Sequence, residues 1–342
     1  MEPERPDAQF IFVVGASRSG TTMIARMLGR HSQICTFREL HFFDQLWTRN
    51  EQSVDAARLA ATLYSIQRKG YHEPRDLMAF QAEAAELVTG MTAEKRETST
   101  AIFREFLLQE AQHNGKRIPC EHTGHNVFYL DEIFALFPNS SVINVVRDPR
   151  AVLLSQKNWW RRRMLGDSNL SKLHGLRQKV NYHPVTMGNL WNASVRAAGR
   201  YRDDKRVLQL NFEWCVEDGE RLAQTLCQFL RLEFAPEMLK VPHVGSSLHR
   251  DRHDRTGVDA SRASAWRDGG LTAAEIRLCQ RVVRRQLSPN GYEAVSVRGG
   301  LLGMLTLRLL WPLQALVAFV WNMRRVKHPL DAIRRRLRRA SA

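Results

Sequence analysis

A glycine-rich loop near the start of the chain, set between an apolar run and an amphipathic segment, most constrains the fold. Phe10 to Val14 is short, apolar and rich in β-branched residues, a pattern that predicts a buried strand. The loop follows as Gly15-Ala16-Ser17-Arg18-Ser19-Gly20-Thr21-Thr22, and residues 23–31 have the spacing of a helix. A strand, a loop and a helix in this order predict the opening of a parallel α/β sheet.

The spacing of the glycines in this loop indicates an anion site. Gly15 and Gly20 stand five positions apart, as in a P-loop, whose backbone N–H groups and helix dipole face a phosphate. Hydroxyl donors come from Ser17, Ser19, Thr21 and Thr22. A nucleoside triphosphatase needs lysine directly after the second glycine, but this chain has Thr21 there and places a cation, Arg18, inside the loop. We therefore expect an anion other than a metal-bound triphosphate.

A second anion-binding pair is predicted at the end of another strand. Ser141 to Val146 reads as a buried strand that runs into Arg147, and Asp148 and Pro149 suit the cap and the first position of a helix. Ser155 lies seven residues past Asp148, about two helical turns, so it returns to the same face. Arg147 and Ser155 can then bind one anion, although an arginine in this position can also serve as an internal brace.

The rest of the chain fits a sheet flanked by helices. Val207 to Leu210 reads as a third strand, and residues 51–114 read as an insertion of two or three helices. Residues 161–184 and 243–270 read as loops. Further helices are expected at residues 130–137, 186–201, 216–231 and 272–287. We predict an α/β domain over residues 1–295, with a P-loop-type parallel sheet, and a helical extension over 296–342.

The extension combines an apolar segment with a basic tail. Leu301 to Val320 is long enough to span a membrane but contains Arg308, which costs a few kcal/mol in a bilayer. The chain has 51 Lys and Arg against 35 Asp and Glu, and residues 324–342 contain eight basic residues and one acid, a net +7. We expect a helix lying in a membrane interface, held by the basic tail on an anionic surface. A packed terminal helix or a contact between copies is the alternative.

The two phosphate motifs resemble those of the sulfotransferases that use 3′-phosphoadenosine 5′-phosphosulfate (PAPS). Residues 17–22 are similar to the family's 5′-phosphosulfate loop, in the arginine form of the tyrosylprotein and bacterial branches, and Arg147…Ser155 is similar to its 3′-phosphate motif. Residues 207–213 resemble a strand followed by Tyr-Glu, with Phe212 in place of tyrosine. Residues 261–267 and 291–293 resemble the closing segment of bacterial members.

This resemblance covers residues 10–293 and implies both a cofactor and a reaction. It implies PAPS as donor, 3′-phosphoadenosine 5′-phosphate (PAP) as product, and sulfonate transfer to a hydroxyl or amine without a metal. The implied cofactor-binding residues are Ser17, Arg18, Ser19, Gly20, Thr21, Thr22, Arg147, Ser155, Ser261 and Arg267.

A third segment supplies the expected base. Residues 38–44, Arg-Glu-Leu-His-Phe-Phe-Asp, resemble the Glu-x-His-Phe-Phe-Asp segment of heparan-type sulfotransferases, which implies Glu39 as the general base, with Arg18 neutralising charge. Cytosolic members use histidine, so His41, His122 and His125 are alternatives. Glu39 paired with Arg38 as structure is another. Residues 121–126 resemble a Glu-Lys-Thr-Pro strand end, with His122 and Gly124 replacing Lys and Pro.

Two other classes of protein remain as alternatives. One is a P-loop kinase or NTPase, and the other is a non-enzymic basic protein that binds membranes. We expect no nucleic-acid partner, since no nucleic-acid-binding motif is visible. The polar N-terminus and the five scattered cysteines lead us to expect a cytoplasmic enzyme at the inner face of the membrane. The acceptor (glycan, lipid, peptide or small molecule) and the oligomeric state stay open.

Overall fold

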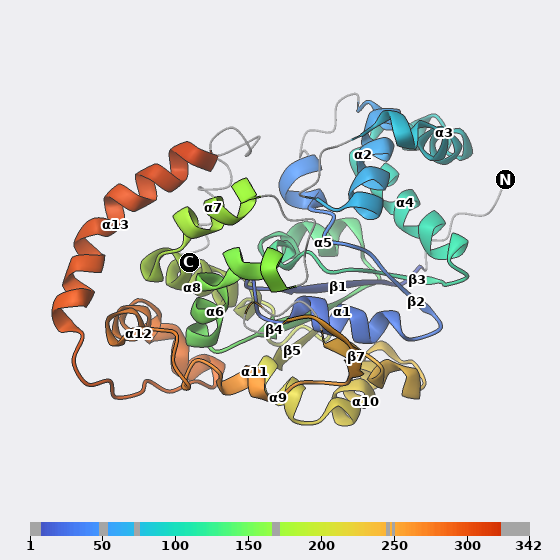
Figure 1. Cartoon of the computed structure of the whole chain (residues 1–342). Helices are drawn as coiled ribbons and strands as arrows, with labels where there is room; N and C mark the ends of the chain where they lie inside the picture. The colour runs from blue at the N-terminus through green and yellow to red at the C-terminus, as the bar shows by residue number, and fades with distance from the viewer. Residues whose placement is uncertain are drawn as a thin grey trace.

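The centre of the molecule is a parallel sheet (Figure 1). The computed structural model describes residues 8–47, 54–71, 76–165, 172–243, 247 and 250–322. Its five-stranded sheet has the order β2-β3-β1-β4-β5, and every neighbouring pair is parallel. The strands are β1 (Phe10–Gly15), β2 (Ile34–Thr36), β3 (Ile118–Glu121), β4 (Ser140–Val146) and β5 (Val207–Asn211). The predicted α/β fold with a P-loop-type sheet is confirmed.

Both faces of the sheet are covered, as the unbroken apolar run in β1 requires. Phe10, Phe12 and Val14 belong to one apolar cluster, and Ile11 and Val13 belong to another on the opposite face. The covering helices are α1 (Thr21–Gly29), α5 (Leu130–Leu136), α6 (Pro149–Lys157), α8 (Pro184–Gly199), α9 (Phe212–Glu217), α10 (Gly219–Leu230) and α12 (Ala273–Leu287). Side chains of α1 and α10 pack in the cluster around Ile11 and Val13.

The segment between β2 and β3 is helical. It contains the short helix η1 (Phe42–Leu46), α2 (Ala56–Lys69), η2 (Met78–Phe80), α3 (Gln81–Gly90), η3 (Glu94–Glu97) and α4 (Ser99–His113). Phe42 stacks on Phe103 of α4 with ring centres 3.9 Å apart, and α2 and α4 join the apolar cluster of Phe10 and Phe12. Figure 1 shows α2, α3 and α4 grouped at one end of the molecule. The insertion therefore stands beside the sheet edge where the chain from β2 leads to η1.

Two sequence-based expectations for loops are wrong. Within residues 161–184 the structure has η5 (Trp159–Leu165), which extends into this range, and α7 (Lys172–Asn181). Helix α7 is polar and packs against η5 and α13, so tertiary partners stabilise a segment with little apolar pattern of its own. Within 243–270 the structure has β6 (Pro242–His243) paired with β7 (Arg252–Thr256), and α11 (Ser261–Ser264).

The apolar segment after residue 300 forms α13 (Leu301–Asn322), which is long and apolar enough to cross a membrane. One side packs against the body: Met304 is buried, the Trp311 indole N–H donates to Thr186 Oγ1 at 3.0 Å, and Gln314 Nε2 donates to the Tyr182 carbonyl at 2.6 Å. The other side exposes Leu302, Leu305, Leu309, Leu313, Leu316 and Val320. Figure 1 shows α13 along the side opposite α2, α3 and α4. The basic tail lies outside the described residues.

Candidate functional site

The glycine-rich loop leaves the carboxyl end of β1, the central strand of the sheet. From there the chain leads through α1 to β2 on one side, while β4 lies on the other side of β1. In open α/β sheets, ligands bind outside the carboxyl ends of the strands at such a change of direction. The loops after β1, β3, β4 and β5 all meet at this edge, because the strands are parallel.

The loop has a backbone that L-amino acids rarely adopt. Arg18 has φ 72° and Gly20 has φ 105°, and a Cβ atom added at Gly20 would collide with the Phe212 ring. The Ser19 N–H donates to the Ala16 carbonyl at 3.1 Å, which closes a turn. A turn in which positive-φ residues alternate with ordinary ones can direct its backbone N–H groups toward a common concavity, and helix α1 begins directly behind this turn. The loop thus has the form of an anion cradle.

One buried hydroxyl in this loop points to a ligand. Ser19 is fully buried, and within the described part of the chain its Oγ has no hydrogen-bond partner. Leaving such a group unpaired costs about 1–3 kcal/mol. A phosphate or sulfonate oxygen in the cradle could accept from it. Thr21 is buried as well, whereas Ser17 is exposed.

The loop meets the second predicted motif directly. Arg18 Nε donates to Ser155 Oγ at 3.0 Å, and Arg147 Nη1 donates to the Arg18 carbonyl at 3.1 Å. Arg147 Nη2 donates to the Arg262 carbonyl at 2.6 Å, and Ser155 Oγ lies 2.9 Å from Ser247 Oγ. We name Arg18, Arg147, Arg262 and Ser155 the arginine cluster. Residues 137 positions apart in the chain therefore form one cationic site.

Burial and mutual repulsion shape this cluster. Burial, together with the charges of Arg147 and Arg162, lowers the pKa of Arg18 to about 10. Burial also lowers the pKa of Arg147 to about 10, with Glu213 acting in the opposite direction and Arg262 adding to the lowering. Both guanidinium groups remain charged at neutral pH. An anionic ligand would offset the cost of holding them together.

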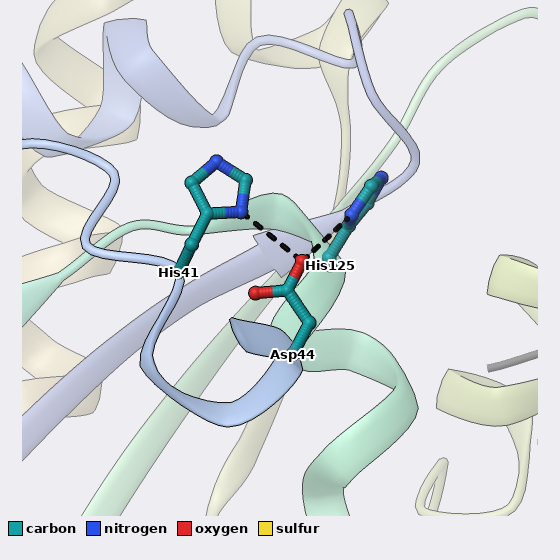
Figure 2. Close-up of side chains that lie close together, drawn as sticks. All are labelled: His41, Asp44 and His125. Carbon is teal, nitrogen blue, oxygen red and sulfur yellow. Dashed lines mark hydrogen bonds and ion pairs between the residues drawn. The ribbon is translucent and has the colours of Figure 1, made fainter. Parts of the chain in front are cut away.

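A second group lies at the same edge and contains acids and histidines. His41 Nδ1 lies 3.2 Å from Asp44 Oδ2, and His125 Nδ1 lies 3.6 Å from the same oxygen. Figure 2 shows the two rings on either side of the Asp44 carboxylate. His41 Nε2 lies 3.6 Å from Glu39 Oε2. We name Glu39, His41, Asp44 and His125 the histidine–carboxylate cluster.

A buried glutamate after β3 fixes the backbone of this cluster. Glu121 accepts from the N–H groups of Leu40 at 3.1 Å and Thr123 at 3.0 Å, from the Thr123 hydroxyl, and from Asn126 Nδ2 at 2.5 Å. Desolvation raises the pKa of Glu121 to about 7. The Thr123 hydroxyl in turn accepts from the His41 N–H at 3.1 Å, so His41 keeps its unusual φ of 52°. Glu121 therefore positions the segment that presents Glu39 and His41.

The comparisons with known proteins decide the family. The model of the sulfotransferase family matches residues 10–236, more than half of the chain. The chain belongs to the sulfotransferase family. It is similar to the sulfotransferase domain of the curacin biosynthetic pathway, with 21% identity and a TM-score of 0.53 over 84% of this chain and 99% of that one. It is also similar to the sulfotransferase domain of the Synechococcus PCC 7002 olefin synthase, with 21% identity and a TM-score of 0.54 over 86% of this chain and 98% of that one.

A relative of undefined function also matches this member of the family. An uncharacterized protein of Aquifex aeolicus (strain VF5) is 22% identical over 280 residues, which cover 77% of this chain. The chain spans about a third of the length of that relative, since the match covers 31% of it. These comparisons establish the family and the fold.

Most of the cofactor-binding residues predicted from the sequence converge on the arginine cluster. The loop 17–22, Arg147 and Ser155 all lie there, and helix α6 begins as expected, with Pro149 at its first turn and Asp148 accepting from the Arg150 N–H. Ser261 and Arg267 are exposed: the Ser261 hydroxyl donates to Asp259 at 2.5 Å, and Arg267 lies over the Trp266 ring at 4.7 Å. Within residues 261–267, it is the Arg262 carbonyl that contacts the cluster, by accepting a hydrogen bond from Arg147. A cofactor role for Ser261 and Arg267 stays a prediction.

The structure adds residues that sequence reasoning missed. The Arg147 guanidinium lies 4.2 Å from the centre of the Phe212 ring, so Phe212 supports the arginine by a cation–π contact. Glu213 accepts from the Asp148 N–H at 3.0 Å and from the Tyr292 hydroxyl at 2.7 Å. The resemblance around 207–213 and 291–293 was the available signal, but it could not show that these segments meet.

The charges of the histidine–carboxylate cluster compensate one another. Desolvation opposes charge on Glu39, but the contact with His41 and the nearby His122 and His125 outweigh it and lower the pKa of Glu39 to about 2. Desolvation likewise opposes charge on His41, whereas Asp44 and Glu39 raise the pKa of His41 to about 10. Burial lowers the pKa of His122. At neutral pH, Glu39 is thus an ionised, half-exposed carboxylate.

Proposed function

We propose that this sulfotransferase moves the sulfonate group of PAPS to a hydroxyl or amine of an acceptor. The observation that carries the proposal is the convergence of the loop cradle, the unpaired Ser19 hydroxyl and the arginine cluster in one place. A ligand with two anionic ends suits it: the loop would hold the 5′-phosphosulfate, and Arg147 with Ser155 would hold the 3′-phosphate.

The proposed step is an in-line displacement at sulfur. The acceptor oxygen or nitrogen forms a bond to sulfur while the bond from sulfur to the bridging phosphate oxygen breaks, and PAP leaves with the electron pair. Glu39 takes the acceptor proton, because it is ionised at neutral pH and its carboxylate is half exposed. Arg18 offsets the charge that grows on the leaving group. The arginines supply the positive charge, so the proposed step uses no metal ion.

His41 is a less suitable base than Glu39 in this arrangement. Its two ring nitrogens lie against Asp44 and Glu39, and its raised pKa leaves it protonated at neutral pH. A protonated imidazole between two carboxylates orients Glu39 rather than accepting a proton. His122, whose pKa is lowered by burial, is the histidine that stays neutral.

PAP binding tests the cofactor assignment. We expect the purified protein to bind PAP in isothermal titration, and Arg147→Ala to raise the Kd about 10–100-fold, because one or two charge-assisted bonds are lost. Arg206→Ala is the matched control, since Arg206 pairs with Asp204 at the surface. An unchanged Kd in Arg147→Ala would contradict the assignment. Hydrolysis of ATP that requires Mg²⁺ would instead favour the kinase or NTPase alternative.

Product analysis tests the reaction. The protein is incubated with labelled PAPS and an extract of membrane lipids and glycans, and mass spectrometry identifies any sulfated product. We expect label to appear in a product with wild-type protein and to fall to background in Glu39→Gln. The mass and fragmentation of the product then separate transfer to oxygen from transfer to nitrogen.

We also propose that this enzyme is cytoplasmic and docks on the anionic inner face of a membrane through α13. The outward side of α13 is apolar along its length, while its inner side is tied to the body by Trp311 and Gln314. A helix held this way lies along a surface more easily than it crosses a bilayer. The basic tail that follows in the sequence would add about 1 kcal/mol per residue near anionic lipid.

Vesicle sedimentation tests the docking. We expect the full chain to sediment with phosphatidylglycerol-containing vesicles and less with phosphatidylcholine alone. The double variant Leu305→Glu/Leu309→Glu should lose most binding, because both side chains are exposed on α13. Met78→Glu is the control, since Met78 is equally apolar and exposed but lies on η2. Wild-type protein that stays in solution with every vesicle, and runs as a dimer, would favour a contact between copies instead.

A further inference from the structure

The three side chains drawn in Figure 2 carry donor atoms of a kind that binds transition metals. One nitrogen each of His41 and His125 and one carboxylate oxygen of Asp44 all lie within 4.8 Å of one another. Imidazole nitrogen together with carboxylate oxygen is a common ligand set for zinc and neighbouring first-row metals. The family resemblance in the sequence includes His41 and Asp44, but His125 comes from the segment where this chain departs from the family pattern.

The distances suit a common ion at the centre of the group. Asp44 Oδ2 lies 3.2 Å from His41 Nδ1 and 3.6 Å from His125 Nδ1. Nitrogen and oxygen ligands about 2.0–2.1 Å from a tetrahedral zinc ion lie about 3.4 Å from each other. An ion could therefore enter with small side-chain movements.

The surroundings hold the ligands in place. His41 stacks on Tyr71 with ring centres 4.1 Å apart, and its other nitrogen, Nε2, lies 3.6 Å from Glu39. A histidine ligand commonly has a carboxylate at its second nitrogen, which fixes the ring. His125 follows Gly124, whose added Cβ would lie 2.9 Å from the Gly15 carbonyl oxygen. The close contact between Gly124 and Gly15 of the glycine-rich loop thus fixes the position of the backbone just before His125.

One carboxylate oxygen of Asp44 is available to accept a further interaction. Its Oδ1 is buried and, among the residues that the structure describes, has no hydrogen-bond partner. The ring nitrogens of His41 and His125 both approach Oδ2, so the second oxygen is left uncompensated. A divalent ion, which carboxylates bind through one or both oxygens, would compensate it better.

We propose that His41, Asp44 and His125 bind one divalent first-row transition-metal ion, of which Zn²⁺ is the best suited. Three protein ligands leave at least one coordination position, which water can fill. The site would lie beside Glu39, which is 3.6 Å from His41 Nε2. The ion would take the place of the proton on His41 Nδ1, because a histidine ligand binds in its neutral form. Binding of the ion requires neither PAPS nor sulfonate transfer.

Cobalt substitution tests the site with a readout other than activity. Full-length protein is treated with chelator, then titrated with Co²⁺ and followed by its visible absorption, with Zn²⁺ added in competition. We expect one equivalent of Co²⁺ with the strong absorption of a four- or five-coordinate site, and displacement by one equivalent of Zn²⁺. Asp44→Asn and His125→Ala should each weaken binding at least 10–100-fold.

A matched histidine variant controls for the other histidines of the chain. His253→Ala removes an exposed histidine of β7 and should leave the titration unchanged. PAP binding by each variant shows that it is folded, and His125→Gln provides a second variant that keeps the size of the side chain. Equal Co²⁺ affinity in wild type, Asp44→Asn and His125→Ala, or no binding by folded wild type, would overturn the site. Neither result affects PAP binding, so the proposed function is tested separately.

Discussion

Two charged clusters lie at the same edge of the sheet and differ in how their charges are compensated. In the arginine cluster, Arg147 and Arg262 carry the same sign as Arg18, and burial and mutual repulsion lower the pKa values of Arg18 and Arg147. In the histidine–carboxylate cluster, the Glu39 and Asp44 carboxylates lie against the protonated His41 ring, and the opposite charges stabilise each other. An anionic ligand would offset the like charges of the first cluster, whereas the second cluster contains charges of both signs.

This difference suits the two clusters to two proposed tasks: the arginine cluster to binding an anionic cofactor, and the histidine–carboxylate cluster to accepting a proton. A set of like charges is preorganised to attract an anion and to offset charge that forms on it. A carboxylate that an imidazolium keeps ionised and oriented is available as a proton acceptor, although the same positive charge weakens it as a base. Glu39 also raises the pKa of Arg18 slightly against the other influences, so the two clusters are close enough to act on one reacting group.

The largest expected effect comes from Glu39, which tests whether the two clusters have separate tasks. Glu39→Gln removes the proposed base and should lower kcat about 10²–10⁴-fold, while the Kd for PAP changes less than threefold. Single-turnover transfer of labelled sulfonate and titration with PAP measure the two quantities. Glu86→Gln, an exposed glutamate of α3, is the control. If Glu39→Gln weakened PAP binding as strongly as Arg147→Ala does, the separation would not hold.

A moderate effect is expected at Gly124, where the loop after β3 lies against the loop after β1. An added Cβ would lie 2.9 Å from the backbone oxygen of Gly15, so Gly124→Ala forces the strand ends apart and should cost about 1–3 kcal/mol of unfolding free energy. Urea denaturation measures this cost.

Gly90→Ala is the control for this variant. Within the described part of the chain no atom lies within 4 Å of the Cβ position at Gly90, which ends α3. We expect Gly90→Ala to be neutral or stabilising by up to about 1 kcal/mol. Equal stability of the two variants would mean that the contact between the β1 and β3 loops is loose.

The smallest expected effect is the pH dependence of stability that the second cluster adds. The pKa of His41 is raised from 6.5 to about 10, so its stabilisation is complete below pH 6.5 and is lost as the pH rises toward 10. The pKa of Glu39 is lowered from 4.5 to about 2, so its share is present above pH 4.5 and is lost on acidification. Between pH 7 and 8.5 we expect the Tm of wild type to fall about 2 °C more than that of His41→Gln.

Calorimetry of both proteins at the same pH values checks this expectation. Groups elsewhere in the chain titrate alike in the two proteins, so their contribution cancels in the difference. Parallel Tm curves for wild type and His41→Gln would show that His41 gains no stabilisation from Asp44 and Glu39.

Much of the fold follows from local sequence. The apolar runs at Phe10 and before Arg147 are each followed by the start of a helix, a pattern that predicts buried parallel strands, and β1 and β4 lie where this pattern indicates. Asp148 and Pro149 specify the start of α6 through short-range hydrogen bonding and a fixed φ. These features depend on neighbours within a few residues.

Other parts could not be predicted locally. Helix α7 is polar and gains its stability from η5 and α13, which are distant in sequence or irregular in pattern. The segment 216–231 divides into α9 and α10 around Asp218, which caps α10 by accepting from the N–H groups of Glu220 and Arg221. Tertiary contacts thus stabilise α7, whereas a local cap that the sequence analysis missed sets the start of α10.

The sequence by itself determined the chemistry that is available: a phosphate loop with Arg18, a strand-end Arg147 with Ser155, and the Glu39–Asp44 segment. Only the tertiary structure decided which of these residues meet. Arg18 donates a hydrogen bond to Ser155, and Phe212 makes a cation–π contact with Arg147. His125 lies beside the same Asp44 oxygen as His41. The physical reason is that residue type and spacing fix local conformation, whereas contacts between distant loops depend on strand order, which the packing of the whole sheet sets.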